Sequence, residues 1–328
     1  MKKWLAILSV FLLASCVPDT EKIPLSFYFW RTSFQLSQTE KDYLQELDVR
    51  KLYVRYCDVA LKNGEAIPVA SVVFNESPEN IDIVPVVYIK NEVFLQNSDT
   101  KDLAAKIMDY IGQINRKNNI QINEVQFDCD WSLKSKDHYF QFIEEAKKLQ
   151  PNLSATIRLH QVKYSKKTGV PAVQHGVLMY YNMGTIDVGD QNSIYDQNIA
   201  HRYIQSFSQY PLPLDIALPI FSWGVHIRKN QVTNLIGGMR LKDMQNDHFD
   251  KLSDHKFQVT EDFMYEGRYL AKGDIIKIEE PSAKQLKEMV ADLRKSIKNK
   301  PKEIILYDLN EQNLTEYETD VYQTVSHW

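Results

Sequence analysis

Apolar residues gather in short runs along the chain, and longer segments of helical or irregular pattern separate these runs. Short apolar runs that are rich in β-branched and aromatic residues and bounded by polar clusters are typical of buried strands. The pattern predicts strands at Leu25–Trp30, Lys51–Ala60, Ile83–Ile89, Glu124–Trp131, Leu153–Val162, Gly176–Met183, Leu214–Ile227 and Glu303–Leu309.

Helical periodicity occupies several of the links between these runs. Ser37 and Glu40 have the spacing of a capping box before an amphipathic stretch that ends at Leu47. Apolar residues three and four apart predict further helices within 100–117, 135–149, 195–208 and 282–298. Strands that alternate with helices pair in parallel through crossovers, so the sequence predicts an α/β protein.

The run of eight strands predicts a (β/α)8 TIM barrel of somewhat irregular form. The links at 61–82 and 163–175 lack a helical pattern, and residues 310–328 do not have the pattern of a full closing helix. An open doubly wound sheet is the competing fold. Such sheets commonly carry a GxGxxG turn, which this sequence lacks.

The link after the seventh strand, residues 228–281, is long enough to hold a small unit of its own. Its second half has the pattern of antiparallel strands, with turns at Glu266-Gly267 and Lys272-Gly273. We therefore expect a small β-rich insertion that rises from the C-terminal face of the barrel, beside any active site.

The first residues have the pattern of an export signal. Lys2 and Lys3 precede an apolar stretch that is too short to span a bilayer. Leu13–Cys16 resembles the bacterial lipobox, which implies a lipoprotein signal peptide at 1–16, a lipidated Cys16, a tether at 17–24 and a barrel domain at 25–328. This resemblance predicts an exported protein of the cell envelope that is held on a membrane, with the outer membrane favoured, by acyl chains at Cys16. An ordinary signal peptide or a membrane anchor is the alternative.

Composition narrows the classes of function. The formal charge of −4 gives no basic surface, so nucleic acid is not expected as a partner. Aromatic residues make up 11% of the chain, and they can pack in a core or form stacking surfaces for sugars. Cys57 and Cys129 are expected to be buried thiols rather than a disulfide. No spacing suits zinc, no cofactor is expected, and the oligomeric state is left open.

The stretch NEVQFDCDWSL, residues 123–133, places two carboxylates in the fourth predicted strand. Alternation puts its apolar residues against outer helices and points Asp128, Asp130 and Ser132 into the barrel. A buried carboxylate is unfavourable unless it is paired or lies near water, and two close carboxylates raise the pKa of one of them, which suits acid–base chemistry. A structural network with an inward Arg55 or Arg158 is the alternative interpretation.

Polar and aromatic residues also occur at the ends of the other predicted strands. A barrel gathers these strand ends at one mouth, where barrel enzymes keep their chemistry. The candidate catalytic residues are Asp130 and Asp128, and Tyr181 at the end of the sixth strand lies at the same mouth. The candidate substrate-binding residues are Trp30, Arg55, Asp58, Tyr88, Ser132, Arg158, His160, Asn182, Trp223 and Asp308.

Three short motifs resemble, in order, those of the family-18 glycoside hydrolases, the chitinase-like barrels. The family's fourth strand ends in Asp-x-Asp-x-Glu, and the chain has DCDWS at 128–132. Its sixth strand carries Met-x-Tyr-Asp or Asn, and its seventh has a Leu-Pro-aromatic-Gly pattern. The chain has MYYN at 179–182 and LPIFSWG at 218–224. Many members also carry an insertion after strand seven. The chain is similar as well to a group of bacterial lipoproteins with barrels of this kind.

The resemblance implies an oligo- or polysaccharide as the partner. By position, Asp130 matches the residue that orients the substrate's acetamide, and Tyr181 matches the hydroxyl that hydrogen-bonds it. Ser132 stands where the family has its proton-donating Glu, and a serine hydroxyl has no useful acidity near neutral pH. The catalytic acid of the family is therefore missing from its usual place.

Two functions remain open on the sequence. The first is a glycoside hydrolase-like enzyme in which Asp130 is the acid, Asp128 tunes its pKa, and a further carboxylate from Asp58, Asp308 or the insertion faces them across the bond. The second is a non-catalytic glycan-binding lipoprotein on a degenerate hydrolase barrel. Metal-dependent hydrolysis by Asp128, Asp130 and His160 is a weaker third possibility. The inward Asp pair favours the first function slightly.

Overall fold

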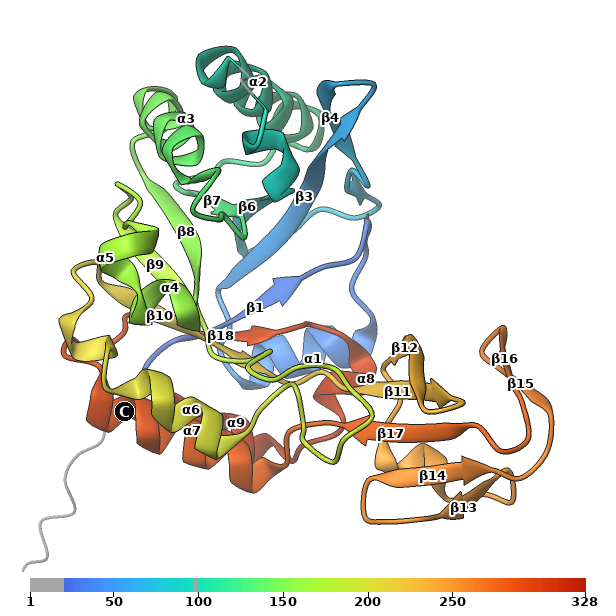
Figure 1. The fold of residues 1–328 in the computed structure, drawn as a ribbon. Helices are drawn as coiled ribbons and strands as arrows, with labels where there is room; N and C mark the ends of the chain where they lie inside the picture. Colours follow the sequence, from blue (N-terminus) through green and yellow to red (C-terminus); the bar gives the residue numbers. More distant parts are fainter. Residues whose placement is uncertain (1–20, 97–98) are drawn as a thin grey trace, which may run out of the picture.

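Eight parallel strands close into a barrel in the computed structural model, which describes residues 21–96 and 99–328 (Figure 1). The barrel strands are β1 (Leu25–Phe29), β3 (Lys51–Lys62), β6 (Asp82–Ile89), β7 (Val125–Asp128), β8 (Leu153–Arg158), β9 (His175–Met179), β10 (Leu214–Pro219) and β18 (Ile304–Tyr307). The ring is closed because β1 pairs with both β18 and β3. The predicted TIM barrel is therefore confirmed. The predicted signal segment with Cys16, and residues 17–20 of the tether, lie outside the described residues.

Helices cover the outside of the barrel. The longer ones are α1 (Gln38–Glu46), α2 (Thr100–Asn118), α3 (Lys136–Leu149), α6 (Gln197–Ile204) and α7 (Ala283–Ser296). The capping box predicted from Ser37 and Glu40 is present at the start of α1. Helix α2 buries Leu103, Ile107 and Ile111, which is the face that their spacing predicts.

The barrel is irregular where the sequence lacks a helical pattern. Between β3 and β6 the chain forms β4 (Glu65–Val69), which pairs antiparallel with the end of β3, and β5 (Val73–Phe74), which pairs with β2 (Ser33–Phe34). The remaining short elements of the barrel are η1 (Asn91–Phe94), α5 (Ser165–Thr168), η2 (Phe207–Gln209), α8 (Glu311–Leu314) and α9 (Thr319–Ser326).

Several predicted strands are shorter in the structure than in the prediction, and two of the predicted runs contain a second element. The run Leu153–Val162 leaves the sheet after Arg158 and continues as helix α4 (Leu159–Lys163). The run Leu214–Ile227 divides into β10, which belongs to the barrel, and β11 (Trp223–Arg228), which belongs to a second sheet. Hydrophobicity does not reveal these breaks because the residues on both sides of each break are largely buried.

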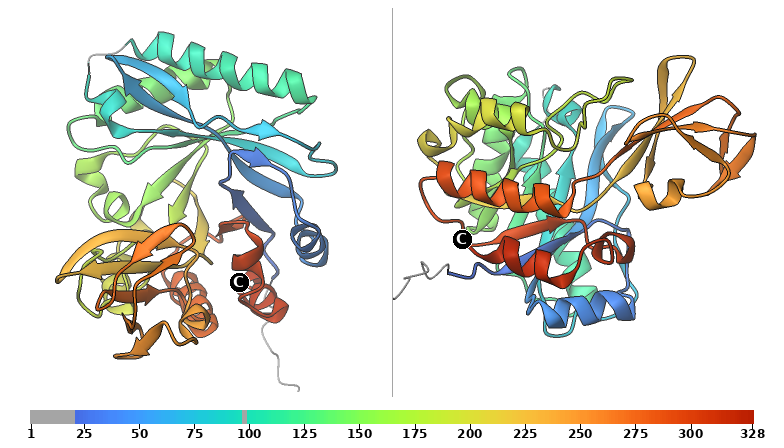
Figure 2. Two further views of the ribbon diagram at one scale, coloured as in Figure 1. Left: turned by 90° about the vertical axis from the view of Figure 1, so that its right-hand side faces the viewer. Right: turned by 90° about the horizontal axis from the view of Figure 1, so that it is seen from below.

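The insertion forms a small antiparallel sheet that projects from one side of the barrel (Figure 1, Figure 2). Its strands are β11, β12 (Gln231–Gly237), β13 (Phe249–Lys251), β14 (Lys256–Val259) and β17 (Ile275–Glu279), accompanied by η3 (Leu241–Met244) and the hairpin of β15 (Phe263–Tyr265) and β16 (Arg268–Leu270). The hairpin turns at Glu266-Gly267, as predicted, with φ of 46° and 77°, the positive values that a two-residue turn requires. The sheet begins at Trp223, ahead of the predicted start at residue 228.

The interior of the ring is packed, so open space is confined to its ends. Val86, Val177, Ala217 and Ile305 pack with tyrosine side chains into a cluster inside the barrel. Cys57 and Cys129 are buried free thiols, as predicted. In the described part of the chain, no helix combines the length and the apolar character needed to cross a membrane.

Candidate functional site

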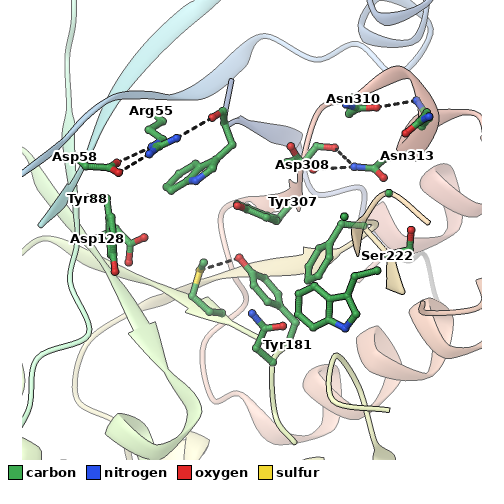
Figure 3. Close-up of a pocket in the computed structure, with 18 of the residues that line it drawn as sticks. Arg55, Asp58, Tyr88, Asp128, Tyr181, Ser222, Tyr307, Asp308, Asn310 and Asn313 are labelled. Carbon is green, nitrogen blue, oxygen red and sulfur yellow. Dashed lines mark hydrogen bonds and ion pairs between the residues drawn. The ribbon is translucent and has the colours of Figure 1, made fainter. Parts of the chain in front are cut away.

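All eight barrel strands contribute to one open pocket of about 560 Å³ (Figure 3), seven of them at or just beyond their carboxyl ends and β3 through Arg55 and Asp58 within the strand. It is lined by Trp30, Arg55, Asp58, Tyr88, Asp128, Arg158, Met179, Tyr181, Asn182, Phe221, Ser222, Trp223, Gly237, Gly238, Tyr307, Asp308, Asn310, Gln312 and Asn313. Most of the predicted site residues are in this set. Asp130, Ser132 and His160 do not line it.

Asp128 is the last residue of β7 and faces the pocket. Its neighbour Phe127 points the other way and packs against Phe142 of α3, with ring centroids 4.9 Å apart. Thr156 of β8 donates a hydrogen bond from Oγ1 to Asp128 Oδ1 over 2.6 Å. Burial raises the pKa of Asp128, and the nearby positive charge of Arg158 opposes that rise. The predicted inward orientation is correct for this residue.

Arg55 and Asp58 face the same pocket although they are three residues apart on β3. Alternation alone would put them on opposite faces, but the register of β3 against β6 shifts between Arg55 and Cys57. This bulge restores Asp58 to the inner face, where it stands opposite Tyr88 of β6. Arg55 Nε donates to Asp58 Oδ1 over 2.7 Å, and Arg55 Nη2 donates to Asp58 Oδ2. Both oxygens of Asp58 are thus held by one guanidinium.

Asp130 does not share the inner face with Asp128. Strand β7 ends at Asp128, so alternation no longer applies, and the side chain of Asp130 is 47% exposed. Arg158 holds both of its oxygens, with Nε to Oδ1 at 2.5 Å and Nη2 to Oδ2 at 3.1 Å. Asp130 lines a smaller hollow beside the main pocket, together with Arg158 and Tyr181, which line both. The alternative of a network with an inward arginine describes it better.

His160 and Ser132 also lie away from the main pocket. His160 is in helix α4 and lines a smaller hollow of about 390 Å³ together with Asp130, Arg158 and Tyr181. Ser132 lies ahead of α3, where its backbone N–H donates to Ser135 Oγ over 2.9 Å. Ser132 therefore helps to start a helix.

Asp308 follows β18 directly and lines the pocket on the side opposite Asp128 (Figure 3). Asn313 of α8 donates from Nδ2 to Asp308 Oδ1 over 2.7 Å and to the Asp308 backbone oxygen over 3.1 Å. Burial raises the pKa of Asp308 to about 6, although the charge of Arg31 and the hydrogen bonds that the carboxyl group accepts from its own backbone N–H and from Asn313 act in the other direction.

Aromatic rings form the floor and one wall of the pocket. Tyr307 lies at their centre, with its ring centroid 5.5 Å from that of Trp30 and 5.6 Å from those of Tyr181 and Phe221. Phe221 in turn lies 5.1 Å from Trp223. Trp30, Trp223 and Tyr307 keep part of their surface open to solvent. Such half-exposed rings are suited to contact the apolar face of a flat ligand.

The insertion, which was expected beside the active site, supplies part of the pocket wall through residues that the sequence analysis did not name. Gly237 and Gly238, at the end of β12, line the pocket. Trp223 of β11 donates from Nε1 to Glu279 Oε2 of β17 over 2.8 Å, which fixes the indole in the second sheet. Phe221, Gln312 and Asn313 were likewise missed. A weak signal existed in the polar stretch DLNEQN at 308–313, which directly follows the eighth strand.

The residues considered for a metal site are not gathered. Asp128 faces the main pocket, whereas Asp130 and His160 line the smaller hollow. Across residues 21–96 and 99–328, no group of three or more His, Cys, Asp or Glu residues is arranged to hold a metal ion. The geometry of the described residues therefore does not support the metal-dependent alternative.

Comparison with known proteins supports the fold through structure alone. No protein-family model matches the chain, and no curated protein sequence matches it. The spore cortex-lytic enzyme SleL of Bacillus cereus has a similar structure, with a TM-score of 0.58 and 12% identity over 94% of this chain and 76% of that one. The chitinase-like agglutinin RobpsCRA of Robinia pseudoacacia is similar with a TM-score of 0.56 and 12% identity over 92% of this chain and 98% of that one.

A family GH18 chitinase from Cycas revoluta, solved in complex with allosamidin, is similar with a TM-score of 0.54 and 9% identity over 92% of this chain and 98% of that one. At these identities the likeness concerns the fold. The chain therefore has the TIM-barrel fold of the family-18 glycoside hydrolases, as its motifs suggested.

Proposed function

We propose that the chain is a glycoside hydrolase-like protein of the cell envelope, which takes an oligosaccharide into the pocket at the barrel mouth. One observation carries this proposal: half-exposed Trp30, Trp223 and Tyr307 stand beside Asp128 and Asp308 in one open pocket. Rings contact the apolar faces of sugars, and carboxyl groups hydrogen-bond their hydroxyls. The same carboxyl groups, with raised pKa values, are suited to proton transfer.

Structural neighbours suggest the first ligand to test. A mutant of the Cycas revoluta GH18 chitinase, solved in complex with (GlcNAc)4, has a similar fold, with a TM-score of 0.53 and 9% identity. A chain of N-acetylglucosamine units is therefore a rational probe. Glycan strands of bacterial peptidoglycan are the second probe, because they contain the same sugar and belong to the proposed compartment.

Glycan binding without cleavage is the second candidate function. It is favoured by Ser132, which replaces the family's acid, and by the ion pair that occupies Asp130. A chitinase-like agglutinin among the structural neighbours has the same fold. The pocket would then act as a sugar-binding surface with the same aromatic residues.

The location of the protein is part of the proposal. The lipobox-like Leu13–Cys16 supports lipidation of Cys16 and an exported barrel held on a membrane, with the outer membrane favoured. Residues 17–24 would separate the barrel from the lipid surface.

The experiment is calorimetric titration of the purified chain with (GlcNAc)4 and with soluble peptidoglycan glycan strands, followed by chromatography of the products. Binding of either probe, weakened by Trp223→Ala, is expected. Tyr164→Ala is the matched control, since this ring is half exposed and does not line the pocket. Absence of binding to both probes would overturn the proposal, and binding without products would leave the second candidate.

A further inference from the structure

The carboxylates around the mouth fall into two groups according to what holds their oxygens. Arg55 holds both oxygens of Asp58, and Arg158 holds both oxygens of Asp130. In such a bidentate pair each carboxylate oxygen already accepts one hydrogen bond and the guanidinium balances the charge, so the group is less available to a ligand.

Asp128 and Asp308 have a different environment. Only neutral donors hold them: Thr156 Oγ1 donates to Asp128, and Asn313 Nδ2 and the residue's own backbone N–H donate to Asp308. Within the described residues, Asp128 Oδ2 has no hydrogen bond to the protein, and neither carboxyl group forms an ion pair with an arginine or lysine. Burial raises the pKa of both groups. These two carboxyl groups can therefore exchange a proton with a ligand.

The two free carboxyl groups stand on opposite walls of the pocket. The order around the ring is β1-β18-β10-β9-β8-β7-β6-β3, so β7 and β18 are separated by three strands in either direction. Asp128 ends β7, and Asp308 follows β18. Figure 3 shows them on the two sides of the pocket, with Tyr307 between them. The charges of both carboxylates add to the effect of burial in raising the pKa of Tyr307.

The geometry points to Asp308 and Asp128 as the two catalytic carboxyl groups, with Asp308 as general acid and Asp128 as general base in an inverting cleavage of the glycosidic bond. This inference rests on the proposed function. A sugar ring seated over Tyr307 would have one carboxyl group on each face. Opposite walls leave room for a water molecule between the carboxyl group and the sugar, which inversion needs and a closely spaced retaining pair does not provide.

The step is balanced without any further reactant. Asp128 Oδ2 accepts a proton from a water molecule, and the oxygen of that water forms a bond to the anomeric carbon. The bond from that carbon to the glycosidic oxygen breaks, and Asp308 Oδ2 gives its proton to the leaving oxygen. One water is consumed, and the two carboxyl groups exchange protons with solvent before the next turnover.

The roles of the two groups follow from their surroundings. Arg158 lies close enough to Asp128 for its charge to favour the ionised form, which a base requires. Asp308 has a pKa of about 6 and is protonated in a large fraction of molecules near that pH, which an acid requires. In this arrangement the proton donor follows β18, so Ser132 in the loop after β7 does not need to supply a proton.

The test uses the full chain, with Asp308→Asn, Asp128→Asn and Asp130→Asn as variants. Asparagine keeps the oxygen that accepts from Asn313 or Thr156, so the folded state is expected to persist. Turnover of (GlcNAc)4, or of peptidoglycan strands if these are the probe that binds, should fall at least a hundredfold for Asp308→Asn and Asp128→Asn and less than tenfold for Asp130→Asn. The binding constants of all three should stay within about fivefold of the wild type.

Two further measurements separate the roles. Proton NMR of the first product formed should show the α-anomer from a β-linked substrate, which is the mark of inversion. With a 2,4-dinitrophenyl glycoside of the same sugar, whose leaving group needs no proton, Asp308→Asn should regain activity and Asp128→Asn should not. Three results would each overturn the inference: the β-anomer as the first product, full activity of Asp308→Asn on the oligosaccharide, or a larger loss of turnover in Asp130→Asn than in the other two variants. Binding without turnover in the wild type would also overturn it and leave glycan binding intact, whereas no binding would contradict the proposed function itself.

Discussion

Arg240, in the loop after β12, donates a hydrogen bond from Nη2 to the side-chain oxygen of Asn313 in α8 over 2.8 Å. This bond fixes the amide of Asn313 with its nitrogen toward Asp308, to which it donates over 2.7 Å. The insertion therefore controls, through one amide, how a carboxyl group of the barrel mouth is held.

Replacing Arg240 should destabilise the fold and release the Asn313 amide that holds Asp308. The side chain is 1% exposed and lies 3.3 Å from Glu280 and 3.6 Å from Glu316, so Arg240→Met leaves two carboxylates without their buried cation. We expect the free energy of unfolding in urea to fall by about 3–5 kcal/mol. Lys242→Met is the matched control, because this exposed lysine also pairs with Glu316 and should change stability by less than about 1 kcal/mol. Equal losses for the two variants would contradict the role given to Arg240.

The raised pKa of Asp308 predicts a pH dependence of stability. Its folded-state pKa of about 6 lies above the ordinary value of 3.8, so its favourable contribution is complete at low pH and is lost as the pH rises through about 6. Between about pH 4 and pH 7.5, the wild type should lose on the order of 2–3 kcal/mol relative to Asp308→Asn. Urea unfolding of both proteins across this range measures the difference, and parallel curves would show that the carboxyl group is not buried as described.

Trp30 should contribute to sugar binding through its half-exposed ring. It packs against Tyr307, and the guanidinium of Arg55 lies 5.6 Å from its ring centroid. Trp30→Ala should raise the dissociation constant of a bound oligosaccharide about tenfold, or about 1.4 kcal/mol, whereas Trp30→Phe should have a smaller effect. Calorimetric titration gives both values, and an unchanged constant in Trp30→Ala would exclude a sugar from this wall.

Trp131 should matter for stability but not for binding, since it lies on the outer side of the segment that carries Asp128. Its indole is 2% exposed, stacks on Tyr139 at 5.1 Å and donates from Nε1 to the backbone oxygen of Thr168 over 3.0 Å. Trp131→Ala should reduce the free energy of unfolding by about 3–5 kcal/mol. Trp131→Phe, which keeps a ring but loses the donor, should cost about 1–2 kcal/mol. A change in sugar affinity of the folded variant would contradict the placement.

Cys16 is predicted to carry the lipid anchor. In bacteria that express the full chain, Cys16→Ser should abolish incorporation of labelled palmitate and release the protein from the membrane fraction, because one polar side chain cannot replace the buried acyl chains. Ser9→Ala, within the same apolar stretch, should leave both unchanged. Membrane association that survives in Cys16→Ser would indicate an uncleaved anchor instead.

The fold could be predicted because it rests on repeated local patterns. Eight buried runs alternate with helical or irregular links, and each run supplied one barrel strand. The same reasoning located Asp128, since Phe127 and Asp128 alternate within a regular strand. It was misleading at Asp130 and His160, where the strand had already ended and the side chains follow the geometry of a loop and a short helix.

The rest of the site depends on contacts between distant segments. Asn313 takes its orientation from Arg240, and Trp223 takes its position from Glu279 in another strand of the insertion. A single sequence does not show such pairs, because no local period links residues far apart along the chain. The placement of Asp128 opposite Asp308 is likewise hidden from a single sequence, since it follows only from the order of strands around the ring.

That order also has a consequence for how the protein is made. Strand β18 is the last of the eight along the chain, and it fills the place between β10 and β1. Until residues 304–307 are available, both neighbours have unpaired edges, which can attract other extended chains. Ring closure also brings Asp308 to the barrel mouth. A nascent or prematurely terminated polypeptide would therefore lack both a protected sheet and the pocket wall that carries Asp308.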